Sequence, residues 1–344
     1  MAKRIVLSFD GTWNTPENRD HGEAAPTNVH RFHVSVLARA PDGTRQVAWY
    51  DQGVGTSWWD RLRGGAFGEG LSDNIKQGYA KLVDEYEDRD DVFILGFSRG
   101  AYSARSLAGF IRKAGLLRRD HKARLDGAYD LYRKRDADAD GPDAVDFRRR
   151  HSREIPILFL GVWDTLGALG IPISGLAGLN TRLFDFHDTR LSRIVKNAYH
   201  AVAIDEHREL FKATLWSLPG LAPDQRVEQR WFVGAHCNVG GGYAEHELSD
   251  IALRWMQEKA QACGLALVPE RIAAVTDACC RGQCRDSFAE FYPKALEEKK
   301  TPYYREIGAA PDGYEKVDES VFRRFAEDPG YRPPNLVAYR QRVP

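Results

Sequence analysis

The sequence predicts an α/β fold, in which a mainly parallel central sheet carries helices on both faces. Short apolar runs that end in glycine or aspartate alternate along the chain with segments of helical periodicity. The apolar runs are nearly continuous, which is typical of parallel strands buried on both faces. With 344 residues, 43% of them hydrophobic, the chain can bury a large core. No internal repeat or long linker divides it, so we expect a single domain over residues 1–344.

Five apolar runs have the length and composition of buried strands. In chain order they are Arg4 to Phe9, Gln46 to Tyr50, Val92 to Leu95, Ile155 to Trp163 and Arg230 to Val233. Helical segments separate them, which predicts parallel neighbours joined by crossover connections.

Three segments have the apolar spacing of helices that cover a sheet: Leu71 to Tyr86, Ala101 to Lys113 and Asp250 to Ala262. The first carries apolar residues at positions 71, 75, 79, 82 and 83. The periodicity of "NAYHAVAIDEHRELF", which contains His200 and His207, predicts a further helix.

Charge and cysteine content exclude several classes of protein. The 49 basic and 49 acidic residues balance, so no overall field favours nucleic acid or an anionic membrane. The charged insertion near 118–153 alternates in sign, which indicates solvated helices rather than a binding tail. The odd count of five cysteines argues against a disulfide framework. We interpret the cluster Cys279, Cys280 and Cys284 as thiols without metal, because no second ligand pair follows, and we expect no cofactor.

The start of the chain, "MAKRIVLSFDG", has neither a long apolar region nor a small-residue cleavage site. No segment approaches about 18 consecutive apolar residues, the length of a membrane-spanning helix. We therefore expect a protein that is cytoplasmic as synthesised.

The stretch "DVFILGFSRGAYSARSLAGF" places Ser98 between Gly96 and Gly100, where a predicted strand becomes a helix. Gly-x-Ser-x-Gly at such a junction is the nucleophile elbow of α/β-hydrolases, a turn so sharp that bulky side chains clash at either glycine. The following helix directs its amino terminus at the serine, so the backbone N–H of Arg99 is a predicted oxyanion donor. We predict that Ser98 is a nucleophile, against the alternative of a structural turn serine.

A serine nucleophile requires a histidine base, and the chain contains ten histidines. His236 follows a late strand and precedes three glycines in "RWFVGAHCNVGGGY", at a strand end where α/β sites form. We favour it over His200 and His207, which lie in the predicted helix.

The acid is expected between serine and histidine in the chain order of this fold. Asp164 directly follows the longest apolar strand, in "IPILFLGVWDTLGALG". The alternatives are an Asx turn or helix cap at Asp164, and Asp205 as the acid. Asp250 is better explained as part of the start of a helix.

The early strand ends in "VLSFDGTWNTPEN", and hydrolases of this fold place a second oxyanion N–H in an early strand-to-helix loop. Gly11 and Thr12 are the candidates for this N–H. Ser8 stands where an aspartyl-phosphate phosphatase would carry its nucleophilic aspartate, so that chemistry is excluded. Asp10 braces this loop or contacts a metal.

Taken together, the segments "FDGTWN", "GFSRGAYSAR", "GVWDTLGALG", "AYHAVAIDEHRELF", "HCNVGGGY", "LSDIALRWM", "YREIG" and "YRPPNL" resemble the uncharacterised α/β-hydrolase family related to class-one type VI secretion lipase effectors (Tle). The resemblance implies a triad of Ser98, Asp164 and His236 and, in effector members, phospholipase A activity on bacterial membrane lipids. It also implies export by a signal-less route such as type VI secretion, with secretion machinery or an immunity protein as partners. One position departs from the family pattern, because Asn238 replaces the usual aspartate beside the final glycines.

We therefore predict a serine hydrolase of carboxylic esters, with phospholipids as the favoured substrate and transient membrane contact. A second insertion near 165–190 is apolar, and Ile171 and Leu176 within it suit a lid or acyl-chain wall; ordinary core or subunit interface is the alternative. Trp58 and Trp59 are further candidates for the pocket or its rim. The competing functions are a soluble non-lipid esterase, thioesterase or amidase, and a non-catalytic interaction module.

Overall fold

The computed structural model of the protein describes residues 2–11, 17–52, 67–134, 138–166, 191–217, 220–292, 300–310 and 314–342. Five predicted site residues lie outside these ranges, namely Thr12, Trp58, Trp59, Ile171 and Leu176, as does most of the apolar insertion near 165–190.

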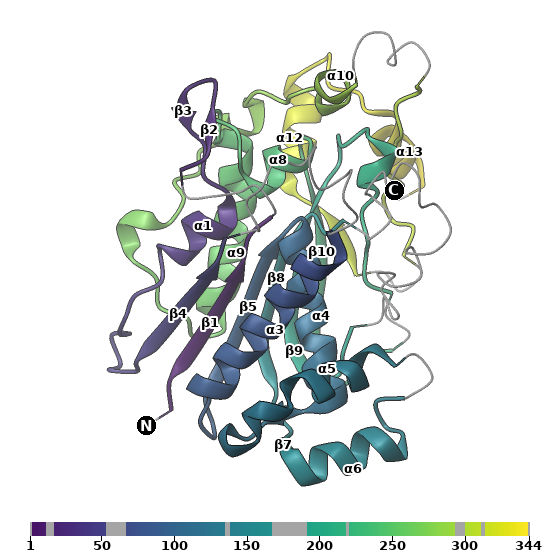
Figure 1. The fold of residues 1–344 in the computed structure, drawn as a ribbon. Coiled ribbons are helices and arrows are strands. Elements are labelled where there is room, and N and C mark those ends of the chain that lie inside the picture. Colours follow the sequence, from purple (N-terminus) through teal and green to yellow (C-terminus); the bar gives the residue numbers. More distant parts are fainter. Residues whose placement is uncertain are drawn as a thin grey trace.

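A seven-stranded sheet forms the centre of the molecule (Figure 1). Its order is β11-β10-β9-β8-β5-β1-β4, and each neighbouring pair is parallel. The bounds are β1 (Arg4–Phe9), β4 (Gln46–Asp51), β5 (Asp91–Phe97), β8 (Ile157–Trp163), β9 (Val195–Ala203), β10 (Arg226–Phe232) and β11 (Glu315–Val317). All five predicted strands are in this sheet, and the predicted α/β-hydrolase-like class is confirmed.

One prediction of secondary structure is wrong. The segment around His200 is not a helix but β9, between β8 and β10. All its residues from Ala198 to Ala203 are buried. Because a strand covered on both faces shows no alternation of polar and apolar residues, the spacing of Ala198, Ala201 and Val202 imitates that of a helix.

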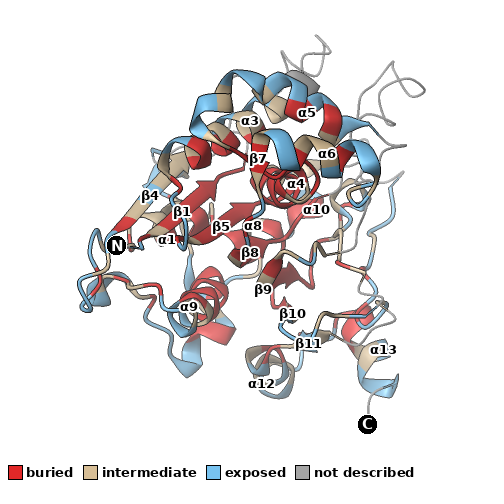
Figure 2. Cartoon of the chain, turned by 90° about the horizontal axis from the view of Figure 1, so that it is seen from below, coloured by how far each residue is buried: buried red, intermediate tan, exposed pale blue. Residues whose placement is uncertain are grey.

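Helices cover both faces of the sheet (Figures 1 and 2). One face carries α3 (Phe67–Glu85), α4 (Arg99–Ala114) and α5 (Leu125–Arg133), whereas α1 (Asn28–His33) and α9 (Glu247–Ala262) lie on the other. The strands supply alternate side chains to the two cores. In β1, Ile5, Leu7 and Phe9 pack into the core under α3 and α4, and Val6 packs into the core under α1 and α9.

A C-terminal layer packs against β10 and β11. It contains α12 (Glu319–Glu327) and α13 (Pro334–Arg342), whose buried Val321 and Leu336 join Trp231 of β10 in a third core. The remaining elements are short: β2 (Arg19–Asp20), β3 (Glu23–Ala24), β6 (Leu116–Leu117), η1 (Arg119–Arg124), α6 (Pro142–His151), β7 (Ser152–Arg153), η3 (Glu209–Phe211), α8 (His236–Gly240), η4 (Pro269–Arg271), η5 (Asp277–Arg281) and α10 (Ser287–Phe291).

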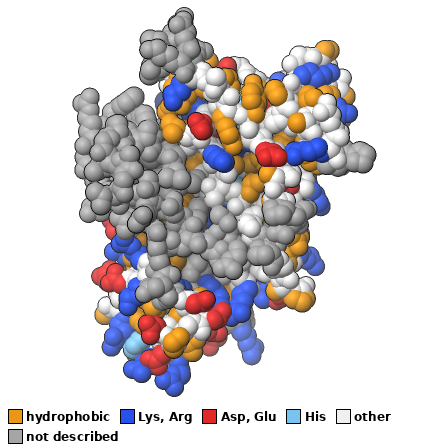
Figure 3. Space-filling view, turned by 90° about the vertical axis from the view of Figure 1, so that its right-hand side faces the viewer, with side chains coloured by type: hydrophobic (Ala, Val, Ile, Leu, Met, Phe, Trp, Pro, Cys, Tyr) orange, Lys and Arg blue, Asp and Glu red, His pale blue; other side chains and the backbone are white. Residues whose placement is uncertain are grey.

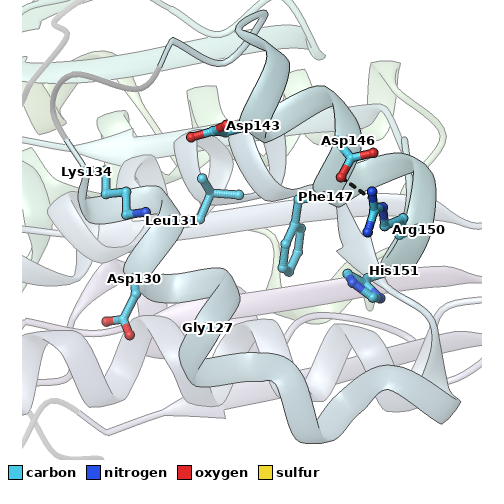
Figure 4. A pocket seen from close by; sticks show the side chains of 9 residues that line it. All are labelled: Gly127, Asp130, Leu131, Lys134, Asp143, Asp146, Phe147, Arg150 and His151. Atoms are coloured by element: carbon cyan, nitrogen blue, oxygen red, sulfur yellow. Dashed lines mark ion pairs between the residues drawn. The ribbon is translucent and has the colours of Figure 1, made fainter.

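The charged insertion is helical, as predicted, and consists mainly of α5 and α6. Basic and acidic side chains mix on the lower part of the face shown in Figure 3. A hollow of about 330 Å³ lies between the two helices, with Phe147 and Leu131 among its lining residues and an ion pair between Asp146 and Arg150 at 2.8 Å beside it (Figure 4). None of the residues predicted to form the active site lines this hollow.

Candidate active site

Ser98 occupies a strained turn between β5 and α4. Its φ of 58° and ψ of −118° lie in a region that residues with a Cβ atom rarely adopt, at a cost of roughly 1–3 kcal/mol. The turn is fixed by the Ser98 N–H, which donates to the carbonyl of Trp163 on the neighbouring strand β8 (3.1 Å). The Ser98 side chain makes no capping hydrogen bond to α4. The hydroxyl therefore stands at the tip of the turn without serving as a helix cap.

The two glycines of the motif are required by close backbone contacts. A Cβ atom on Gly96 would overlap the backbone of Gly100, and a Cβ atom on Gly100 would overlap the Phe9 carbonyl at the end of β1. Both obstacles are backbone atoms of central elements, which cannot move aside as a flexible side chain can. The elbow therefore depends on glycine at both positions.

We predict that Gly100→Ala lowers the free energy of unfolding by about 1–3 kcal/mol, the usual cost of overpacking. Gly127→Ala is the matched control, because Gly127 in α5 has nothing within 4 Å of an added Cβ atom. There the helix propensity of alanine should raise stability by about 0.5–1 kcal/mol. Chemical denaturation of both variants measures the two effects, and equal stability of the two would contradict the close contact at Gly100.

Asp164 and His236 meet at the carboxyl ends of the strands. Asp164 follows β8 directly, and His236 begins α8 just after β10. Nδ1 of His236 lies 2.6 Å from Oδ2 of Asp164, and both side chains are buried. The imidazole also packs against the rings of Phe97 and Phe211, with centroid distances of 4.6 and 5.3 Å. Because Phe97 precedes Ser98, these contacts fix the histidine ring beside the elbow.

The protonation states follow from burial and from neighbouring charges. Burial lowers the pKa of His236, although the carboxylates of Asp164 and Glu206 partly oppose this shift. The imidazole is therefore neutral at pH 7. Burial would raise the pKa of Asp164, but the Arg305 guanidinium and the hydrogen bond from His236 outweigh it and hold that pKa well below its usual range. The pair thus combines an ionised carboxylate with a neutral base.

Arg305 completes the surroundings of Asp164. Its Nη1 donates to Oδ1 (2.6 Å) and its Nη2 to Oδ2 (3.0 Å), while the Ala203 N–H also donates to Oδ1 (3.0 Å). Reasoning from sequence missed Arg305, because a single arginine in "YREIG" carries no local signal of a partner 141 positions away.

A second ion pair lies against the histidine. The Glu206 carboxylate accepts hydrogen bonds from Arg208 (2.7 Å), from the His236 N–H (3.2 Å) and from the Ser287 hydroxyl (3.0 Å). Arg208 in turn lies over the ring of Phe211, 3.6 Å from its centroid. The sequence does not single out Glu206 and Arg208, because the periodicity of their segment predicts a helix.

The alternative acid and bases have other partners. Asp205 accepts hydrogen bonds from the Gly234 N–H (2.7 Å) and the Tyr331 hydroxyl (3.0 Å). His200 lies in β9, where it accepts a hydrogen bond from the Thr165 N–H (3.1 Å), and burial lowers its pKa to about 3. His207 contacts the Tyr303 carbonyl. The structure thus pairs Asp164, rather than Asp205, with His236.

Asp10 braces the loop after β1. Its carboxylate accepts hydrogen bonds from the Gly11 N–H (2.7 Å), the Thr27 hydroxyl (2.5 Å) and the Tyr50 hydroxyl (2.6 Å). In this arrangement the Gly11 N–H is engaged by Asp10. Across the described ranges, no three His, Cys, Asp or Glu side chains gather in a group that could hold a metal. All five cysteines are free thiols.

Asn238, the residue that departs from the family pattern, holds two loop segments together through its side-chain amide. Its Oδ1 accepts hydrogen bonds from the N–H groups of Ala235 (3.1 Å) and Arg285 (3.2 Å), and its Nδ2 donates to the Gln283 carbonyl (3.0 Å). The amide thereby ties the turn before α8 to the segment that precedes α10.

A strained serine between two glycines follows the central parallel strand β5, and an aspartate and a histidine are paired at the ends of β8 and β10, an arrangement typical of the α/β-hydrolase fold. Residues 3–259 match the family model described as "T6SS, Phospholipase effector Tle1-like, catalytic domain", and the chain belongs to this family. The resemblance to the Tle effectors inferred from the sequence motifs is confirmed.

Other similarities are more distant. An uncharacterised protein of Saccharomyces cerevisiae is 30% identical over 235 residues, which cover 61% of this chain and 32% of that protein. The chain thus spans about a third of the length of this relative. A crystal structure of an uncharacterised Pseudomonas aeruginosa protein has 20% identity and a TM-score of 0.47, covering 81% of this chain and 50% of that one. The structure of the Tle1 effector bound to the VgrG spike has 20% identity and a TM-score of 0.40, covering 70% of this chain and 51% of that one.

Of the helices described here, none is both long enough and apolar enough to cross a bilayer.

Proposed function

We propose that the chain is a serine hydrolase of carboxylic esters and that its substrates are lipid esters, phospholipids above all. The observation that carries the proposal is the 2.6 Å contact between Asp164 and His236 beside the Ser98 elbow. Membership of the Tle1-like phospholipase effector family supports lipid as the substrate and the type VI machinery as the export route.

In the proposed mechanism, Oγ of Ser98 attacks the ester carbonyl while His236 accepts its proton. Asp164 holds the imidazole by Nδ1 and stabilises its cation. The oxyanion forms at the amino terminus of α4, where the Arg99 N–H is the proposed donor. The Thr12 N–H is the proposed second donor, because the Gly11 N–H already donates to Asp10. Collapse of the intermediate breaks the ester bond, and the leaving alcohol takes the proton from His236. Water, deprotonated by His236, then attacks the acyl-enzyme carbonyl; the bond to Oγ of Ser98 breaks, the fatty acid leaves, and Oγ takes the proton back from His236.

Substrate binding is proposed to use apolar side chains near the carboxyl ends of the strands. Trp58, Trp59, Ile171 and Leu176 remain proposed contacts on the basis of sequence. Because the net charge is zero, contact with a bilayer would depend on such apolar surface rather than on attraction to anionic headgroups.

The proposal is tested by covalent labelling followed by substrate comparison. A fluorophosphonate should modify Ser98, which mass spectrometry of the digested protein identifies. The protein should then release fatty acid from phosphatidylcholine vesicles. If Ser98 is labelled but the protein hydrolyses only short soluble esters, the protein is a soluble esterase and not a lipase. If Ser98 is not labelled, a non-catalytic interaction module is favoured.

A further inference from the structure

Arg305 is a buried guanidinium that contacts both oxygens of the Asp164 carboxylate. The Arg305 side chain is 2% exposed and that of Asp164 is 0% exposed. Nη1 of Arg305 also donates to the Ala203 carbonyl (2.8 Å) at the end of β9. On α13, Nδ2 of Asn335 donates to the carbonyls of Arg305 and Ile204, each at 3.1 Å. The arginine is therefore fixed at its head by β9 and at its backbone by the C-terminal helix.

This placement meets a requirement of the proposed chemistry. The acid of a serine hydrolase must be ionised and must direct one oxygen at Nδ1 of the histidine. Full burial opposes ionisation, and a carboxylate at a strand end could rotate between its partners. The two-point contact with Arg305 counters both effects, because a planar guanidinium matches a carboxylate only in a fixed orientation.

The other charges around the pair do not replace Arg305. Glu206 and Arg208 face His236 from the segment after β9, but they are paired with one another. His200 of β9 and Arg105 of α4 also face this region; burial lowers the pKa of His200, which leaves it neutral, and Arg105 donates to the Thr214 carbonyl. Within the described part of the chain, no other arginine or lysine forms an ion pair with Asp164.

We propose that Arg305 is a positioning residue of the hydrolase, which clamps the Asp164 carboxylate so that Oδ2 faces His236. The inference rests on the proposed function. It also extends the catalytic unit, because Arg305 lies beyond residues 3–259, the part that matches the catalytic-domain family model. The C-terminal layer of this chain thus forms part of the active site and does more than cover the sheet edge.

The test is the pH dependence of fluorophosphonate labelling at Ser98 in the full chain. In Arg305→Met, the plateau rate, which is reached where His236 is neutral, should fall on the order of 100-fold, because the carboxylate loses its orientation. The acidic limb, which is the pH range where the rate falls as His236 takes up a proton, should move to higher pH by on the order of one unit. Without Arg305, the uncompensated charge of Asp164 stabilises the His236 imidazolium, so the histidine becomes protonated at higher pH. Protonation of the unpaired, buried Asp164 carboxyl would also lower the labelling rate at a higher pH than in the wild type. In Arg305→Lys the charge is kept but the two-point contact is lost, so the plateau should fall with a smaller shift of the limb.

Lys3→Met is the matched control for the loss of a buried ion pair. Lys3 contacts Asp90 (2.6 Å) at the amino end of the sheet, so its loss should lower stability without changing the plateau or the limb. A folded Arg305→Met variant with the wild-type profile would overturn the inference, as would an Arg305→Lys variant with the wild-type plateau.

The wild-type protein provides a measurement that does not depend on variant folding. If Arg305 keeps Asp164 ionised, only His236 titrates, and below the pKa of His236 the logarithm of the labelling rate should fall with a slope of one while the protein stays folded. A slope of two would show that Asp164 also titrates there and would overturn the inference alone. A wild-type protein that does not label at Ser98 would overturn the proposed function together with the inference.

Discussion

Ser98→Ala is expected to reduce ester turnover by roughly 10³- to 10⁶-fold while leaving the folded state nearly intact. The loss follows because no other group supplies the attacking oxygen, and only transition-state contacts to the backbone remain. Stability should change little, since the Ser98 side chain does not cap α4 and alanine keeps the Cβ atom at φ 58°. Initial rates on a soluble short-chain ester, compared with thermal unfolding of the same preparation, measure both quantities.

Ser103→Ala is the matched control on the same helix. The Ser103 hydroxyl is buried and has no hydrogen-bond partner among the described residues, so its removal should preserve turnover. Wild-type rates in a clean Ser98→Ala preparation would contradict the serine-hydrolase proposal, whatever the control shows.

The parts of the fold that could be predicted from sequence are those with local signals. The turn at Ser98 can be predicted from the motif alone, because the two glycines needed for close backbone contact lie within two positions of the serine in the chain. Asp164 marks the end of the apolar run that forms β8, and three nearby glycines mark the loop at His236. Position at the carboxyl end of a parallel strand then predicts that Asp164 and His236 lie close together.

The remaining features depend on contacts that leave no local pattern. β9 resembles a helix because both of its faces are buried, and the three-residue β11 is too short to show any periodicity. Arg305 reaches Asp164 only after the chain has passed through β9, β10 and α9. Its role depends on the burial of its partner, which is a property of the packed structure and cannot be recognised in the sequence around it.

Asp164→Asn is expected to reduce turnover by about 10⁴-fold. An amide at this position must direct either its NH₂ group or its oxygen at Nδ1 of His236. The first choice holds the imidazole in the tautomer that cannot accept the Ser98 proton, and the second directs the NH₂ group at Arg305, where two donors oppose each other. The substitution also leaves the Arg305 guanidinium buried without its anion, at a cost of about 3–5 kcal/mol in stability. Turnover must therefore be expressed per folded molecule, with the folded fraction taken from denaturant unfolding.

Asp205→Asn separates the catalytic effect from the loss of a buried carboxylate in general. Asp205 accepts hydrogen bonds from Gly234 and Tyr331 on the same carboxylate oxygen, so the oxygen of an amide can accept both in its place. Its turnover should stay within several-fold of the wild type, the effect of an indirect contact at most. The reverse result, a loss in Asp205→Asn and activity in Asp164→Asn, would transfer the role of acid to Asp205. It would then require the 2.6 Å contact between Asp164 and His236 to be structural, while the Ser98 elbow would keep its proposed role.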